Sequence, residues 1–245
     1  MDNDPKYWEE LWKSDNYEIN DGNKELIHEI IKYNIKNKKI IEIGSGRGID
    51  AIDLARLGAE VYVLDYIEEA LQITKKLADK ENVNLKYILA DARKITYENN
   101  YFDIVYHAGV LEHFTEPLPL LKEQYRILKK DGMIFVSVPQ KFTLYTIRKQ
   151  FLQLFNRWFA GWETQFSPGK LKKIVSEAGF DVVNIFGYGY YPGFLWRIFE
   201  FEKSRWQKII PRLILKNYTN IMNKFRSTKV MPYINVNVVV VGRKN

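Results

Sequence analysis

The sequence contains no cysteine among its 245 residues and only three histidines. Without thiols the chain has no disulfide framework, no cysteine-ligated zinc or iron–sulfur cluster and no thiol nucleophile. A chain of this length can bury enough apolar surface to fold without such cross-links. The lack of cysteine suits a reducing compartment, so we expect a cytoplasmic protein.

Long apolar runs are also scarce. The longest, Ile234–Val241, is interrupted by Asn235 and Asn237 and is far shorter than the ~20 residues that cross a bilayer. The opening residues, MDNDPK, lack the basic start and apolar run of a signal peptide. We therefore expect neither a membrane-spanning helix nor a secretory leader.

The net charge of +7 is concentrated in two segments. Lys and Arg outnumber Glu by nine to two in residues 192–232 and by four to one in residues 141–167, which leaves −3 for the rest of the chain. The same two segments hold four of the six tryptophans. A basic, aromatic surface on a mildly acidic body is compatible with an anionic partner, either a lipid surface or a nucleic acid.

Strand and helix patterns alternate along the chain. Strands are predicted at residues 39–44, 60–65, 85–90, 102–107, 133–138, 181–188 and 234–241. Helices are predicted at 49–57, at 67–80, from Thr115 to the Asp131–Gly132 turn, and from Ser167–Pro168 to Gly179. This alternation predicts an α/β fold with a Rossmann-like, doubly wound seven-stranded sheet, mostly parallel with one antiparallel strand, and helices on both faces.

We expect residues 1–245 to form a single domain. Two connections, at about 141–166 and 192–232, are longer than such sheets usually need, and both have helical patterns. We expect these inserts to form a helical lid or cap.

The glycine-rich turn EIGSGRG, residues 42–48, follows the first strand and opens a helix. Glycines allow a backbone to approach a ligand closely, and a helix N-terminus offers free N–H groups. Position 49 is Ile, so the dinucleotide fingerprint is incomplete and NAD is disfavoured; the Lys-Ser or Lys-Thr pair of a P-loop is also absent. Asp65, at the end of the second strand, could accept the hydroxyls of a ribose, or could cap the next helix together with Glu68.

These motifs resemble the class I S-adenosylmethionine-dependent methyltransferases, in the small-molecule branch that includes ubiquinone-biosynthesis enzymes. The resembling stretches are EIGSGRG, VLD at 63–65, LAD at 89–91, FDIVYHAGVLEHF at 102–114 and LKKDGMIFVSVP at 128–139. The resemblance covers about residues 39–139 and implies S-adenosylmethionine as the cofactor. It places Gly44 and Gly46 at the methionine part, Asp65 at the ribose, Tyr66 on the adenine face, Asp91 and Ala92 at the adenine edge, and His107 and Ala108 at the sulfonium end. Glu42 flanks the turn and could hold a cationic group of the same ligand.

Simpler structural roles remain open for several of these residues. Tyr66 could be a surface residue, and Asp91 could only order the turn after the third strand. Trp8 and Trp12, four residues apart on a helix at the N-terminal end, resemble an entry helix that covers the cofactor, or they could be ordinary helix packing.

Methyl transfer needs the nucleophile, methyl carbon and sulfur in line, so positioning supplies much of the rate. A base is needed only when the acceptor enters protonated. His113, just beyond the fourth strand, is the predicted catalytic base, although it could instead order its loop. Glu112 is a second candidate base; relatives that bind magnesium here carry more acidic residues than HAGVLEH, so we expect no metal. His28 lies on an amphipathic helix, where we expect a structural role.

The predicted function is in-line methyl transfer to a small-molecule or lipid-linked acceptor. In that case residues 192–232 could contact a membrane surface peripherally, or could only cap the site. An RNA methyltransferase and a non-catalytic S-adenosylmethionine-binding interaction module are the alternatives. Nucleic acid is the less favoured partner, because HAGV follows the fourth strand in place of the Asn/Asp-Pro-Pro-aromatic run of base-modifying enzymes.

Overall fold

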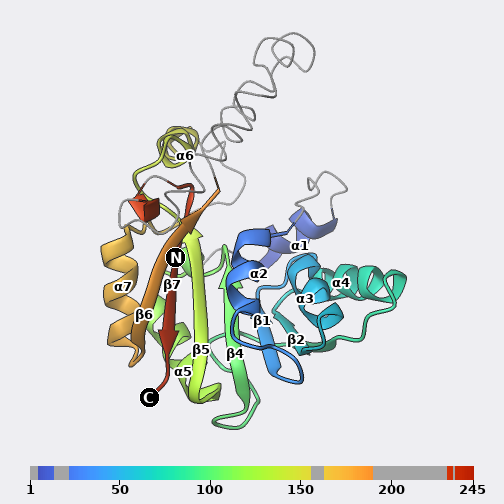
Figure 1. The fold of residues 1–245 in the computed structure, drawn as a ribbon. Helices are drawn as coiled ribbons and strands as arrows, with labels where there is room; N and C mark the ends of the chain where they lie inside the picture. The colour runs from blue at the N-terminus through green and yellow to red at the C-terminus, as the bar shows by residue number, and fades with distance from the viewer. Residues whose placement is uncertain (1–4, 14–21, 156–162, 190–230, 234) are drawn as a thin grey trace, which may run out of the picture.

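A seven-stranded sheet forms the centre of the fold (Figure 1). The computed structural model describes residues 5–13, 22–155, 163–189, 231–233 and 235–245. The strands are β1 (Lys39–Ile43), β2 (Glu60–Asp65), β3 (Lys86–Leu89), β4 (Phe102–Ala108), β5 (Leu128–Pro139), β6 (Asp181–Tyr188) and β7 (Asn237–Arg243). Their order is β3-β2-β1-β4-β5-β7-β6. The five neighbouring strands β3, β2, β1, β4 and β5 are mutually parallel, and β7 runs antiparallel to its two neighbours, β5 and β6. This arrangement confirms the predicted fold class.

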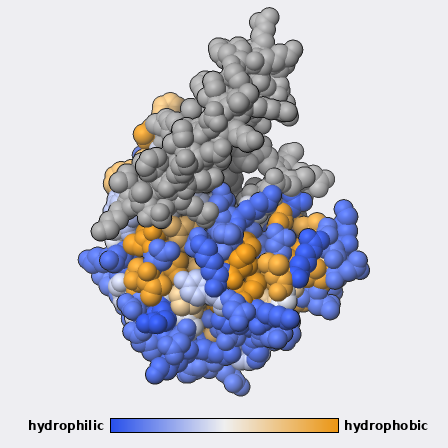
Figure 2. Space-filling model, in the orientation of Figure 1, coloured by the Kyte–Doolittle hydropathy of each residue, from blue (hydrophilic) through white to orange (hydrophobic). Residues whose placement is uncertain are grey.

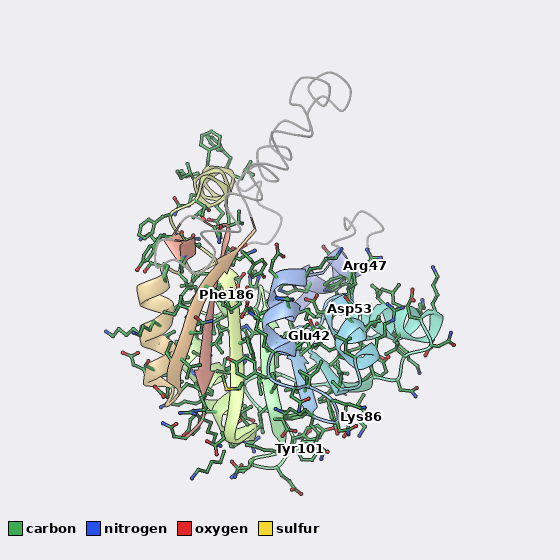
Figure 3. All side chains as sticks on the ribbon, viewed as in Figure 1. Glu42, Arg47, Asp53, Lys86, Tyr101 and Phe186 are labelled. Atoms are coloured by element: carbon green, nitrogen blue, oxygen red, sulfur yellow. The ribbon has the colours of Figure 1, made fainter. Side chains whose placement is uncertain are left out.

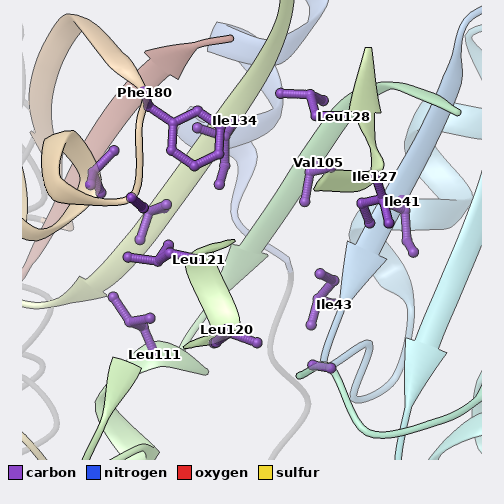
Figure 4. Close-up of a cluster of buried hydrophobic side chains, with 14 of the residues drawn as sticks. Ile41, Ile43, Val105, Leu111, Leu120, Leu121, Ile127, Leu128, Ile134 and Phe180 are labelled. Atoms are coloured by element: carbon purple, nitrogen blue, oxygen red, sulfur yellow. The ribbon is translucent and has the colours of Figure 1, made fainter. Parts of the chain in front are cut away.

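Helices cover both faces of this sheet. One layer contains α2 (Lys24–Ile31), α3 (Ile49–Arg56) and α4 (Glu68–Lys80), and the other contains α5 (Pro117–Ile127) and α7 (Pro168–Glu177). Successive strand residues point to opposite faces, so Ile40 packs in the first layer whereas Ile41 and Ile43 pack in the second. Figure 4 shows Ile41 and Ile43 in the cluster that includes Leu120 and Leu121 of α5.

Two further helices lie outside these layers. α1 (Pro5–Lys13) contacts α4, and α6 (Leu144–Leu154) follows β5 beyond its carboxyl end. Thr143 caps α6, its hydroxyl oxygen accepting a hydrogen bond from the Thr146 N–H at 3.2 Å. The helical prediction for the first insert is therefore confirmed over α6. The second insert, 192–232, lies outside the described residues except for its last two, which begin a short 3₁₀ turn, η3 (Met231–Tyr233).

The helix predicted to end at Asp131–Gly132 ends earlier. α5 stops at Ile127 and β5 begins at once, with Leu128 fully buried and paired to β4. The Lys244 ammonium donates hydrogen bonds to the Leu128 carbonyl at 2.8 Å and to the Tyr125 carbonyl at 2.7 Å. Because Lys244, next to the C-terminus, donates hydrogen bonds to these two carbonyls, they do not need the N–H groups of a further helical turn.

The last strand also differs from its prediction. β7 runs from Asn237 to Arg243 rather than over 234–241, because β5 is long enough to pair with it as far as Met133 opposite Arg243. Within the described part of the chain, no helix combines the length and apolar character that a membrane crossing requires.

Candidate active site

A cavity of about 830 Å³ lies at the carboxyl edge of the sheet, around the ends of β1 and β4. From β1 the chain passes through α3 to β2, whereas from β4 it passes through α5 to β5 on the other side. Strand order reverses at this point, and open α/β sheets bind their ligands in the crevice that results. The volume is within the range of small-molecule and cofactor sites.

The glycine turn forms one wall of this cavity. Gly44 has φ +69° and a Cβ built on it would meet Val110 Cγ2 at 2.4 Å, so no side chain fits there. Gly46 has φ +51°, and its built Cβ would lie 3.2 Å from the ring of Trp12. The Gly44 N–H donates to the Leu64 carbonyl at 2.8 Å, which ties the turn to β2. The sequence therefore predicts this turn correctly, and it leaves backbone rather than side chains facing the cavity.

Trp8 and Trp12 also line the cavity, so α1 lies over the glycine turn. The Trp8 ring meets the His113 ring edge-on, with 4.9 Å between centroids. Both tryptophans thus lie where the entry-helix interpretation placed them.

Glu42 is a buried acid at the base of the cavity. Its side chain is 6% exposed, and its Oε2 has no hydrogen-bond partner among the described residues. Burial raises its pKa well above the usual range, and the negative charge of Asp50 raises it further. Figure 3 shows Glu42 within the body of the fold, and Arg47 at the edge beside α1. An unpartnered buried carboxyl oxygen beside the glycine turn fits a ligand that brings a positive charge or a proton.

Asp50 is held by a chain of polar groups from distant parts of the sequence. The backbone N–H of Asn23 donates to Asp50 Oδ1 at 2.7 Å, and its amide group donates to Oδ2 at 2.6 Å. The Tyr188 hydroxyl donates to Asn23 Oδ1 at 3.0 Å and lies 2.9 Å from the Ser137 hydroxyl. All four line the cavity, so this network fixes the acidic wall.

Asp65 ends β2 and is 6% exposed. Burial raises its pKa to about 6, although N–H groups of the neighbouring backbone, including Ser45 and Gly46, favour its charged form. Its Oδ1 accepts from the Ile67 N–H at 3.0 Å. α4 begins only at Glu68 without a side-chain cap, so the capping alternative is not what the structure contains. The carboxylate lines the cavity instead.

The other adenine-side residues gather at the ends of β2 and β3. Tyr66, Asp91 and Ala92 all line the cavity. The Asp91 carboxylate also accepts from the Arg93 N–H at 2.8 Å and from its guanidinium at 2.7 Å, which lowers the pKa of Asp91. Its turn-forming role and its place at the cavity therefore occur together, with the carboxylate engaged by Arg93.

His107 does not lie where the family pattern places it. The side chain is fully buried and is not among the residues that line the cavity. Burial lowers its pKa to about 3, with the nearby Gln124 of α5 opposing that shift. Alternation along β4 explains the difference, because Ala108 lines the cavity and its neighbour His107 points to the opposite face.

The loop after β4 forms a second wall of the cavity, adjacent to the glycine turn. It includes Gly109, Val110 and a short 3₁₀ turn, η1 (Leu111–His113), from which Glu112 and His113 line the cavity. Glu112 is 2% exposed, its Oε2 has no hydrogen-bond partner among the described residues, and burial raises its pKa to about 8. His113 thus lies at the predicted place, with a second titratable group beside it.

The first insert adds one charged side chain, that of Glu163, to this wall. Glu163 lines the cavity and forms a buried ion pair with Lys149 of α6; the two side chains are 4% and 1% exposed. The Thr164 N–H donates to the Glu112 carbonyl at 2.6 Å, which fixes the returning strand of the insert against η1. Within the described residues, no group of three or more His, Asp or Glu side chains is arranged to hold a metal ion.

Five lining residues are not among the site residues that the sequence predicts. Asn23, Asp50, Ser137, Glu163 and Tyr188 come from five separate elements or loops. Only Ser137 and Tyr188 follow a usable rule, since each lies near the end of a strand at the edge where ligands bind.

Replacing Asp65 with Asn should stabilise the protein above pH 6. The folded-state pKa of about 6 lies above the unfolded value of about 3.9, so ionising this buried group costs roughly 1–3 kcal/mol at pH 7.5. Asn can still accept the Ile67 N–H bond. Denaturant unfolding should show the gain at pH 7.5 and its disappearance as the pH falls from 6 to 4.

Asp53→Asn is the matched control, because the Asp53 side chain is 42% exposed and its replacement should change stability by less than about 0.5 kcal/mol. An Asp65→Asn protein less stable than the parent at pH 7.5 would contradict the assignment of burial as the dominant effect.

Comparison with known proteins agrees with this geometry. A family profile described as a methyltransferase domain matches residues 41–136. The chain is 28% identical over 162 residues to the ubiquinone biosynthesis O-methyltransferase of Dinoroseobacter shibae, covering 64% of this chain and 65% of that protein. The enzyme of the same name from Coxiella burnetii is 26% identical over 163 residues, covering 64% and 70%. The chain thus matches just under two thirds of the first relative's length.

Solved structures share the fold at lower identity. Magnesium protoporphyrin IX methyltransferase from Synechocystis PCC 6803, with bound S-adenosylhomocysteine, has a TM-score of 0.60 at 15% identity, covering 98% of this chain and 93% of its own. A possible histamine N-methyltransferase from Thermotoga maritima has a TM-score of 0.59 at 18% identity, covering 89% and 88%. Residues 41–136 thus match a methyltransferase domain, and the fold is the one found in S-adenosylmethionine-dependent methyltransferases; S-adenosylmethionine is the cofactor that these similarities support.

Proposed function

We propose that this protein transfers a methyl group from S-adenosylmethionine to the hydroxyl group of a small, largely apolar or lipid-linked acceptor. The observation that carries the proposal is the single cavity in which the glycine turn, Asp65 and the Glu112–His113 loop meet. The names of the sequence relatives, which are O-methyltransferases of ubiquinone biosynthesis, support a hydroxyl acceptor.

The residues at the cofactor end fit a cationic nucleoside better than a dinucleotide. Glu42, Asp50 and Asp65 make this wall acidic, which favours an ammonium or sulfonium group and disfavours a pyrophosphate. In the proposed arrangement Gly44 and Gly46 approach the methionine part, and Asp65 accepts hydrogen bonds from the ribose hydroxyls. Tyr66, Asp91 and Ala92 hold the adenine. When bound, the cofactor supplies an activated methyl group on a sulfonium.

The protein's own contribution at the other end is positioning and proton removal. Ala108 and the loop after it also line the cavity, where the acceptor would enter. His113 lines the same wall, and we assign it the role of general base that accepts the hydroxyl proton. Trp8 packs edge-on against its ring and restricts its orientation.

Gly46→Arg should abolish cofactor binding. Position 46 has φ +51° and the ring of Trp12 lies 3.2 Å from a built Cβ, so an Arg side chain must enter the cavity or displace α1. Calorimetry should detect S-adenosylmethionine and S-adenosylhomocysteine binding to the parent, no NAD binding, and neither ligand on the variant. Gly169→Arg on α7, where a built Cβ meets nothing within 4 Å, should bind as the parent does. Tight NAD binding without sulfonium binding would overturn the cofactor assignment.

His113→Ala should lower turnover by about 10²-fold or more while leaving cofactor affinity nearly unchanged, as expected for the loss of a general base. Acceptors can be found by incubating the protein with labelled S-adenosylmethionine and a metabolite extract and identifying methylated products by mass spectrometry. His28→Ala, on the exposed side of α2, is the control and should retain turnover. Unchanged turnover in His113→Ala would return this residue to a structural role, and a protein that binds cofactor but methylates nothing would favour a non-catalytic binding module.

An acceptor of this kind is available at a membrane surface, and we propose peripheral contact there through the first and second inserts. On α6 three apolar side chains are exposed, Ile147 at 60%, Phe151 at 62% and Leu154 at 81%. Figure 2 shows hydrophobic surface in the upper left part of the molecule, where Figure 1 places α6. The second insert, 192–232, lies outside the described residues, but its sequence combines nine basic residues with Trp196 and Trp206. Apolar residues interspersed with cations are typical of interfacial helices.

Vesicle binding tests this contact. Vesicles containing anionic lipid should retain the protein at low salt and release it as salt rises, since each basic residue near such a surface adds about 1 kcal/mol. Phe151→Ser with Leu154→Ser should weaken binding, whereas Leu57→Ser, an exposed apolar residue on the opposite part of the fold, should not. Salt-sensitive retention on RNA without vesicle binding would favour the RNA alternative, and retention on neither would leave a cap over a freely diffusing acceptor.

A further inference from the structure

Among the described residues, two buried carboxyl groups on the acceptor wall lie near one buried cation. Glu112, Glu163 and Lys149 have side chains almost inaccessible to solvent, and both glutamates line the cavity. Lys149 pairs with Glu163, and Glu112 Oε2 has no hydrogen-bond partner among the described residues. Two carboxyl groups thus lie beside one ammonium group, and the unpartnered Oε2 of Glu112 leaves a place for a proton or a positive group.

We propose that Glu112 releases its proton when the positively charged cofactor occupies the cavity, and takes up the proton that the acceptor loses on methylation. This inference rests on the proposed function and adds a destination for the proton. Glu112 is then a further proton-accepting group of the reaction, while Glu163 and Lys149 are positioning residues that set its charge state.

The geometry places Glu112 on a loop beside the glycine turn, where the cofactor is expected. The loop that carries it touches the glycine turn, because Val110 Cγ2 would lie 2.4 Å from a Cβ at Gly44. Glu112 Oε1 lies 3.7 Å from a Cβ built on Gly109, so the carboxyl group folds back over the end of β4. The Thr164 N–H bond to the Glu112 carbonyl holds the same loop against the insert.

Burial is the main reason why the protonated form of Glu112 is favoured in the free protein. Burial and the negative charge of Glu163 raise its pKa to about 8, and Lys149 only partly opposes them. His113 follows Glu112 on the same wall. The Tyr188 hydroxyl of β6 is close enough to Glu112 that the negative charge of Glu112 raises the pKa of Tyr188. A positive charge within about 4–6 Å lowers a carboxyl pKa by about 1–3, which shifts Glu112 toward its ionised form at neutral pH.

Protons and charges balance over one turnover. As the new O–CH₃ bond forms, the S–CH₃ bond breaks and its electron pair returns to sulfur, which becomes neutral. The acceptor's O–H bond breaks and its proton passes to His113 or directly to Glu112. Loss of the sulfonium charge restores the high proton affinity of Glu112, so the carboxyl group ends the cycle protonated.

Proton release on cofactor binding tests the proposal without knowledge of the acceptor. Calorimetry in buffers of different ionisation enthalpy gives the number of protons released when S-adenosylmethionine or S-adenosylhomocysteine binds. The two ligands share their amino and carboxylate groups and differ in the charge on sulfur, so their difference isolates groups near the sulfur. At pH 7.5 the parent protein should release about 0.5–0.8 proton more with the sulfonium ligand, since a group of pKa about 8 is mostly protonated there.

Glu112→Gln should remove this difference while still binding both ligands. Glu163→Gln should shift the pH of maximal difference downward by about one unit, because a like charge next to Glu112 is lost. Glu116→Gln, an exposed acid just beyond the same loop, should behave as the parent, and thermal unfolding should verify that each variant is folded.

Equal proton release with both ligands in the parent, or a difference that persists in Glu112→Gln, would overturn the proposal. If neither ligand binds, the proposed function fails instead. Should Glu112→Gln not fold, the pH shift in Glu163→Gln decides alone, and an unshifted maximum counts against the proposal.

Discussion

The parallel pairing of β1 with β4 is the constraint on which the site depends. Neighbouring parallel strands cannot be joined directly, and here the two connections lead away to opposite sides of the sheet. No crossover helix therefore covers the carboxyl ends of β1 and β4, and the loops that leave them face each other. The glycine turn leaves β1 at this opening, and the Glu112–His113 loop leaves β4 there.

The second general feature is the concentration of acids with raised pKa values. Glu42, Asp50, Asp65 and Glu112 are all buried, and for each the largest cause of the shift is desolvation. Ionised carboxylates without partners destabilise the folded state, so this wall is costly unless a cationic ligand shares it. Such a distribution is typical of functional sites, where local stability is lower than elsewhere in the fold.

The sequence predicts the sheet and the glycine turn well because their signals are local. Strand periodicity, the glycines at 44 and 46 and the acid that ends β2 each depend on a few adjacent residues. The family resemblance predicts His107 at the sulfonium end of the cofactor, but strand alternation alone places His107 on the face of the sheet away from Ala108. The Lys149–Glu163 pair and the Asn23–Tyr188 bond join residues 14 and 165 positions apart, and no local pattern encodes such contacts. α5 likewise ends where a residue from the C-terminus reaches its carbonyls.

The two ends of the first insert meet at the edge of the sheet and form a neck. The Lys141 N–H donates to the Phe166 carbonyl at 2.8 Å, and Gln140 and Phe166 form a bridge, so the two ends of the insert are held side by side at the sheet. Its buried ion pair is internal, since Lys149 and Glu163 both belong to it. Closing a loop across an already formed neck costs little additional entropy as the loop grows or shrinks. The segment between these anchor points can therefore vary in length and sequence as a unit, with its own charge pair, without altering a strand of the sheet.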